Sequence, residues 1–122
     1  MDNSVRISRI YQGINLQKKR SHKRIIKRLP LKFGISATNT IGFTSDVSPV
    51  GMFIRTNRGL PPETHINIAL ETPSGDILHL EGIVKRTVKY SSHLGTIVKN
   101  GMGIELRGSN SNYIEFVKSY YD

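Results

Sequence analysis

The feature that most constrains the fold of this chain is a series of short apolar runs, separated by turn residues. Residues 66–70 alternate apolar and polar side chains, as a half-buried strand does. Residues 72–76 form a turn, and residues 78–88 are predicted to be a long strand with Gly82 as a candidate bulge. No helical periodicity separates the runs. The pattern therefore predicts an antiparallel barrel or sandwich.

Other runs along the chain have the same character. In one of them Ile41, Phe43 and Val47 alternate, and an Asn100-Gly101 turn precedes the last strand. The expected strands outside the central hairpin cover residues 29–35, 41–47, 52–55, 96–98 and 101–106.

The chain ends in a predicted helix over residues 112–121. Asn112 followed by Glu115 is typical of a capping box. The apolar residues that follow have the spacing of one helical face, which favours packing on the sheet over base stacking; they are Tyr113, Phe116, Val117 and Tyr120.

Length and composition fit one small domain. The chain has 122 residues, no cysteine and no apolar run near the ~20 residues that cross a bilayer, so we expect a cytoplasmic protein without disulfides. No nucleophile motif or phosphate-cradling loop is present. The four histidines are scattered, without metal-ligand spacing. We therefore expect neither an enzyme, nor a metal site, nor a cofactor.

The net charge of +9 lies almost entirely in the N-terminal part. Up to residue 35 there are ten Lys or Arg against one Asp, whereas the basic and acidic residues after it cancel. Seven of the eleven residues in 18–28 are basic. Such a segment attracts anions, and a solvated basic tail is the alternative. Residues 7–14 carry apolar residues at helical spacing and are either a tail or an interface helix.

Two motifs stand out against this background. The first is Arg20-Ser-His-Lys-Arg24, whose arginines point to one side of an extended loop about 13 Å apart. The second is Asp46-Val-Ser48-Pro-Val-Gly51, in which Asp46 and Ser48 share one face of a strand. Arg24 and Arg28 form another pair at the same spacing.

Together the two motifs resemble the paired signature of PilZ domains, bacterial receptors for cyclic di-GMP. Later segments are similar to the strands of that family, so the resemblance runs from about Lys18 to Tyr121. It implies an all-β fold: a six-stranded antiparallel barrel with a C-terminal α-helix. The expected parts are a tail or short helix at 1–17 and a domain at 18–122, with a ligand-binding arm at 18–28, the barrel at 29–107 and the helix at 112–121.

The resemblance also implies a ligand and a mechanism. Arginine forks match phosphate oxygens and the guanine O6/N7 edge, a carboxylate accepts from guanine N1–H, and a hydroxyl donates to phosphate. The implied ligand-binding residues are Arg20, Arg24, Asp46, Ser48, Gly51 and Lys19. Lys19, just before the first arginine, favours an intercalated pair of nucleotides.

The implied protein is a single-domain adaptor whose arm folds over the ligand and signals to an unidentified effector protein. Two alternatives stay open. One is a barrel that binds nucleic acid electrostatically through the basic arm, although no specific nucleic acid is expected. The other is a PilZ-like interaction protein that does not bind nucleotide.

Overall fold

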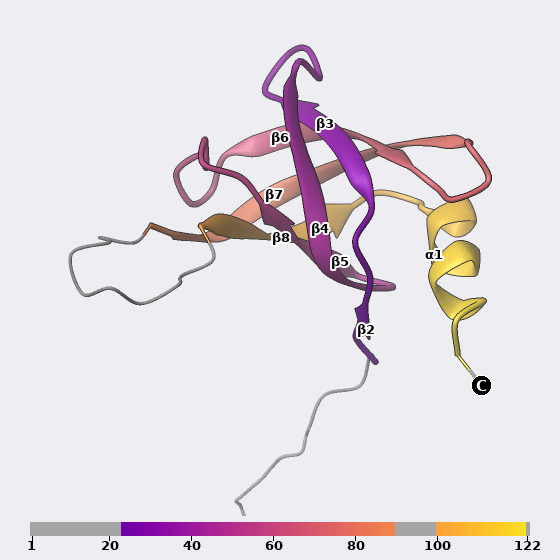
Figure 1. The fold of residues 1–122 in the computed structure, drawn as a ribbon. Coiled ribbons are helices and arrows are strands. Elements are labelled where there is room, and N and C mark those ends of the chain that lie inside the picture. Colours follow the sequence, from indigo (N-terminus) through magenta and orange to yellow (C-terminus); the bar gives the residue numbers. More distant parts are fainter. Residues whose placement is uncertain (1–22, 90–99, 122) are drawn as a thin grey trace, which may run out of the picture.

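The structure, a computed structural model, describes residues 23–89 and 100–121 (Figure 1). Six strands close into an antiparallel barrel in the order β3, β4, β5, β8, β7, β6 and back to β3. They are β3 (Pro30–Gly34), β4 (Thr40–Ser48), β5 (Gly51–Arg55), β6 (His65–Glu71), β7 (Ile77–Val88) and β8 (Gly101–Arg107). This confirms the predicted six-stranded barrel. The predicted strand at 96–98 and the segment at 7–14 lie outside the described residues.

The barrel interior is filled by the inward-facing residues of all six strands. In β6 the buried residues Ile66, Ile68 and Leu70 alternate with more exposed ones, as predicted. The other strands contribute Leu31, Phe33, Val47, Met52, Ile54, Leu80, Val84, Met102 and Ile104. Because the sheet closes on itself, each of the six strands pairs with a neighbour on both sides over at least part of its length.

The alternation predicted in β4 is present, but its first half faces away from the core. Ile41 is 75% exposed and Phe43 is half-buried, whereas Gly42 and Thr44 face inward. A β-bulge between Thr44 and Asp46 then shifts the register. The extra residue brings Val47 into the core, so period-two spacing counted across the bulge assigns the wrong face to Ile41 and Phe43.

A second bulge lies in β7, between Val84 and Arg86. The predicted bulge at Gly82 is therefore wrong. Gly82 has another reason to lack a side chain, because a Cβ there would come within 2.5 Å of the Ile104 side chain. It lets β7 and β8 approach closely.

The C-terminal helix α1 spans Ser111–Lys118, so it begins before the predicted residue 112 and ends before 121. The capping-box prediction is wrong, since the N-cap residue is Asn110 and Asn112 lies within the first turn. The Asn110 amide donates to the carbonyls of Arg107 and Gly108, which fixes the turn that leads into the helix. Tyr113 and Val117 are buried against the barrel, and Phe116 packs partly against it.

The helix packs at the end of the barrel that carries the β4–β5 turn. The Tyr113 hydroxyl lies 2.9 Å from the carbonyl of Ser48 and 3.0 Å from that of Gly51. Within the part of the chain that the structure describes, no helix is long and apolar enough to cross a membrane.

Candidate functional site

The described part of the basic segment lies along β4. The short strand β2 (Ile25–Ile26) pairs with Val47 and Asp46, beside the start of the second motif (Figure 1). Further along, the Lys27 N–H donates to the Ser45 carbonyl. This pairing brings Arg24, the last residue of the first motif, next to the second motif.

The fully buried hydroxyl of Thr44 forms hydrogen bonds with the segment that connects β2 to β3. It accepts a hydrogen bond from the Leu29 N–H at 2.9 Å and donates one to the Lys27 carbonyl at 2.7 Å. The C-terminal end adds contacts, since the Tyr121 hydroxyl donates to the Lys23 carbonyl and the Lys27 ammonium lies over the Tyr120 ring. The segment is thus held from both sides.

Two of the predicted site residues form an ion pair. The Arg24 guanidinium donates to the Asp46 carboxylate, and their side chains are 38% and 26% exposed. Both therefore remain accessible from solvent. Each group has spare hydrogen-bonding capacity, because a guanidinium carries five N–H donors and a carboxylate two acceptor oxygens.

Asp46 begins a row of residues that crosses four neighbouring strands. It lies opposite Phe53 in β5, Phe53 lies opposite Gly103 in β8, and Gly103 lies opposite Arg86 in β7. With about 4.8 Å between strands, the row is about 14 Å long. The Arg86 guanidinium carbon lies 5.8 Å from the centre of the Phe53 ring. Gly103 adds no side chain to the middle of the row.

This row borders a surface hollow of about 340 Å³. Its lining consists of Arg24, Asp46, Met52, Phe53, Lys85, Arg86, Gly103 and Ile104. The Lys85 ammonium lies 3.8 Å from Glu63 and 3.6 Å from Glu105. Arg24 and Arg86 thus lie at the two ends of the row, with the Asp46 carboxylate beside Arg24.

The two bulges explain why so many polar side chains meet there. In β4 the bulge leaves the consecutive residues Ser45 and Asp46 partly exposed, and in β7 the bulge leaves Lys85 and Arg86 exposed. A regular strand would turn one of each pair into the core. The arrangement suits a flat anionic ligand that also offers hydrogen-bond donors.

Ser48 and Gly51 are placed differently from Arg24 and Asp46. Neither lines the hollow, and Ser48 is only 1% exposed. A Cβ at Gly51 would lie 2.3 Å from the Ile104 carbonyl oxygen, so this glycine is needed for β5 to approach β8. Both residues flank the turn that Tyr113 holds. In the structure, Ser48 and Gly51 therefore maintain the geometry of the β4–β5 hairpin.

Arg20 and Lys19 lie outside the described residues. The sequence analysis missed Phe53, Lys85, Arg86 and Gly103, because strand pairing alone brings these residues from β5, β7 and β8 beside the motifs. A usable signal was the adjacent pair Lys85-Arg86 in an alternating strand. Among the described residues, no three histidine, aspartate or glutamate side chains gather as a metal site would require.

Comparison with known proteins gives a consistent result. A family model described as "PilZ domain" matches residues 18–117. The solved structure of the Bacillus subtilis inhibitor of motility (MotI/DgrA) is similar, with a TM-score of 0.68 and 14% sequence identity. That similarity covers 84% of this chain and 48% of that one, so the chain spans about half the length of MotI/DgrA.

The PilZ domain of CeSA from a cellulose-synthesizing bacterium is also similar. The TM-score is 0.57 at 19% identity, over 82% of this chain and 99% of that one. No curated protein matches the sequence.

Proposed function

The chain belongs to the PilZ domain family, and from this membership we propose that it is a receptor that binds cyclic di-GMP in the hollow between Arg24 and Arg86. PilZ domains are receptor or adaptor domains rather than enzymes. The observation that carries the proposal is the row Asp46, Phe53, Gly103 and Arg86, with Arg24 at its acidic end.

The chemistry of the row matches that of the nucleotide. Cyclic di-GMP has two phosphodiesters and two guanines, so it requires cationic forks, a carboxylate and a flat surface. Asp46 accepts hydrogen bonds from a guanine N1–H and amino group, while Arg24 and Arg86 bind phosphates or the O6/N7 edge. Because Gly103 has no side chain, the Arg86 side chain lies over the middle of the row, 3.4 Å from where a Cβ of residue 103 would stand. Arg20, the partner of Arg24 in the motif, binds the same ligand in this proposal.

Signalling follows from the contacts of the basic segment. Arg24 is paired with Asp46, and a ligand that engages both groups changes that ion pair. The segment also contacts Tyr120 and Tyr121, so its rearrangement would alter the surface at the C-terminal end. We propose that an effector protein recognises this change. Membership of the family supports a cytoplasmic signalling role.

Calorimetric titration with cyclic di-GMP tests the proposal. Arg86→Ala should weaken binding at least tenfold, because a guanidinium in the hollow is lost. Arg107→Ala is the matched control, since it removes the same charge from β8 outside the hollow. Its affinity should stay within threefold of the unmodified chain. Equal losses in both variants would point to diffuse electrostatic attraction and contradict a defined site.

Asp46→Ala separates a nucleotide receptor from a general polyanion binder. Removing the carboxylate raises the net charge and releases Arg24, so duplex DNA should bind more tightly. Cyclic di-GMP should bind more weakly, because its guanine loses an acceptor. Tighter binding of both ligands would favour the nucleic-acid alternative. No binding of cyclic di-GMP to the unmodified chain would favour an interaction protein without nucleotide.

A further inference from the structure

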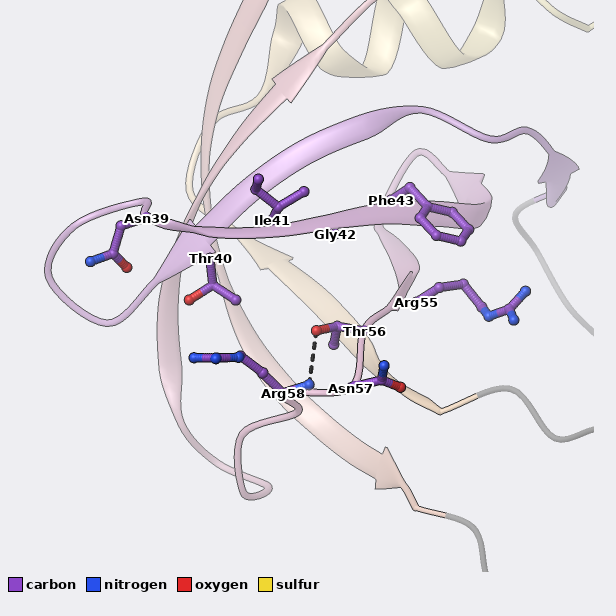
Figure 2. Close-up of a pocket in the computed structure, with 9 residues that line it drawn as sticks. All are labelled: Asn39, Thr40, Ile41, Gly42, Phe43, Arg55, Thr56, Asn57 and Arg58. Atoms are coloured by element: carbon purple, nitrogen blue, oxygen red, sulfur yellow. Dashed lines mark hydrogen bonds between the residues drawn. The ribbon is translucent and has the colours of Figure 1, made fainter. Parts of the chain in front are cut away.

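A second, larger concavity lies elsewhere on the barrel and shares no residue with the hollow. This groove of about 550 Å³ lies between the first half of β4 and the chain that follows β5 (Figure 2). One wall is residues 39–43 and the other is residues 55–58. Its size falls within the range of ligand-binding sites in proteins.

The groove exists because β4 is longer than its partner on that side. The β4–β5 pairing ends with Phe43 opposite Arg55, although β4 begins at Thr40. Beyond Arg55 the chain turns toward the start of β8, where the Thr56 N–H donates to the Asn100 carbonyl. The Asn100 amide also donates to Asn57. Within residues 23–89 and 100–121, no strand therefore lies opposite residues 40–42 of β4 on the β5 side.

The backbone of Ile41 faces this open side. The Thr44 N–H donates to the carbonyl of Leu29, on the β3 side. Along an antiparallel strand, the backbone N–H and C=O groups of successive residues point alternately to one neighbouring strand and to the other. The backbone N–H and C=O groups of Gly42 and Thr40 consequently also point toward β3. Those of Ile41 and Phe43 point to the opposite side of β4. The side chain of Ile41 is 75% exposed. An open edge with an exposed apolar residue is a template for an added strand.

The charge of the groove indicates which kind of added strand would bind there. The described residues that line the groove include Arg55 and Arg58 but no carboxylate. Arg28 adds a third cation, since its guanidinium lies 3.8 Å from the centre of the Phe43 ring, and Arg55 lies 5.5 Å from the same ring. Figure 2 shows the Arg58 and Thr40 side chains extending into the space between the two walls.

We propose that this groove binds an extended acidic segment of a partner protein, which pairs with the β4 edge at Ile41. The segment places an apolar side chain beside Ile41 and carboxylates near Arg55 and Arg58. An extended peptide has backbone N–H and C=O groups that can pair with those of Ile41, as a neighbouring strand would. A nucleic-acid strand has no such backbone, so the open edge favours a peptide. Three residues of a strand span about 10 Å, the length of residues 40–42.

Fluorescence anisotropy of the full chain with a labelled nine-residue peptide of alternating Asp and Val tests this site. The double variant Arg55→Glu/Arg58→Glu should weaken binding at least tenfold. The control Arg107→Glu/Lys118→Glu makes the same change in charge away from the groove and should weaken it less than threefold. Arg58→Glu alone, at an exposed position, should weaken binding at least threefold and serves if the double variant is not folded.

Two peptides test for backbone pairing. One carries N-methyl groups on the amides of its Asp residues and the other on those of its Val residues, so charge is equal in both. Only one edge of the peptide faces β4, so one of them should lose at least tenfold in affinity and the other should not. The amide of Ile41 should also exchange with solvent more slowly when the parent peptide is bound.

Three outcomes would overturn the proposal. They are equal affinity of the two methylated peptides, equal losses in the groove and control variants, and a thymidine oligonucleotide whose binding depends on Arg55 and Arg58 while that of the peptide does not. The last result would assign the groove to single-stranded nucleic acid.

Discussion

At the scale of single residues, Arg24 is the predicted ligand-binding residue that the structure places most directly, since it lies beside Asp46 in the hollow. Arg24→Ala should weaken binding of cyclic di-GMP by about 2 kcal/mol, and Arg24→Lys should restore little of it, because lysine lacks the fork. Arg28→Ala should cost much less, since Arg28 packs on Phe43. Calorimetry gives all three values. Similar losses at positions 24 and 28 would contradict a specific role for Arg24.

Two glycines near the site have different predicted roles. Gly51→Ala forces a Cβ to within 2.3 Å of a backbone oxygen, so the free energy of unfolding should fall by about 3 kcal/mol. At Gly103 a Cβ would meet only the flexible Arg86 side chain at 3.4 Å, so Gly103→Ala should change stability by about 1 kcal/mol or less.

Ligand binding should distinguish the same two variants. A methyl group at position 103 would press on the Arg86 side chain and shift its guanidinium, so Gly103→Ala should weaken binding of cyclic di-GMP at least tenfold while the protein stays folded. Urea unfolding and calorimetry measure the two effects. A stable Gly103→Ala protein with unchanged affinity would contradict a ligand-binding role for Arg86 in the position that it takes over Gly103.

Tyr113 links the helix to the β4–β5 turn. Tyr113→Phe removes the hydroxyl that bonds to the carbonyls of Ser48 and Gly51. The free energy of unfolding should therefore fall by about 1–2 kcal/mol at pH 8. Burial raises the pKa of Tyr113 above its ordinary value of 10.0, against the opposing effect of Arg24. The neutral phenol of Tyr113 therefore stabilises the folded state at pH values below its ordinary pKa. As the pH rises past that pKa, the phenol ionises in the unfolded chain first, and its contribution to the free energy of unfolding falls.

The difference in unfolding free energy between the unmodified chain and Tyr113→Phe should therefore narrow from pH 8 to pH 11. Denaturant titrations at several pH values measure it. A difference that is independent of pH would contradict burial of the phenol as the source of the effect.

At the scale of elements, Thr44 joins the basic segment to the barrel. Thr44→Val removes the partner of the Leu29 N–H and of the Lys27 carbonyl, so the free energy of unfolding should fall by about 2–3 kcal/mol. Thr44→Ser keeps the hydroxyl and should cost only about 1 kcal/mol for the lost methyl group. Hydrogen exchange at the Lys27 amide should accelerate in Thr44→Val alone. Equal effects of both substitutions would assign the role of Thr44 to packing.

The elements also show what the sequence could and could not predict. The turn at 72–76 and the strand that begins near Ile66 follow from local patterns, because each residue there obeys period two or a turn preference. The bulges at Ser45 and Lys85 do not, since a bulge depends on the partner strand; the trace that the second bulge leaves in the sequence is the adjacent charged pair Lys85-Arg86. The face of Ile41 and the exposure of Arg86 depend on those bulges.

The candidate site divides along the same line. Its motif residues Arg24 and Asp46 were predicted from sequence, and the structure brings them into contact. Their neighbours Phe53, Gly103 and Arg86 join them only through the order of strands in the closed barrel, which pairs β5 with β8 and β8 with β7. No pattern within one segment carries that information. The predicted pair Ser48 and Gly51 followed from the motif, but their burial follows from the packing of α1 and β8.

At the scale of the whole molecule, the net charge of +9 would attract any polyanion, so affinity alone does not identify the ligand. The hollow and the groove have no lining residue in common. The proposed nucleotide and the proposed acidic segment therefore do not compete for any described lining residue.

Salt dependence separates specific from diffuse binding to this basic chain. Binding through phosphates releases counterions, and the slope of affinity against salt grows with the number of phosphates neutralised. Cyclic di-GMP offers two, so its dissociation constant should rise by no more than about tenfold between 50 and 200 mM salt. A duplex that contacts six or more phosphates should lose about a thousandfold and bind weakly at physiological salt. Calorimetry and anisotropy across the same salt series measure both slopes. A tight, sequence-tolerant duplex complex at the upper end of the series, with no binding of cyclic di-GMP there, would make nucleic acid the physiological ligand of the basic segment.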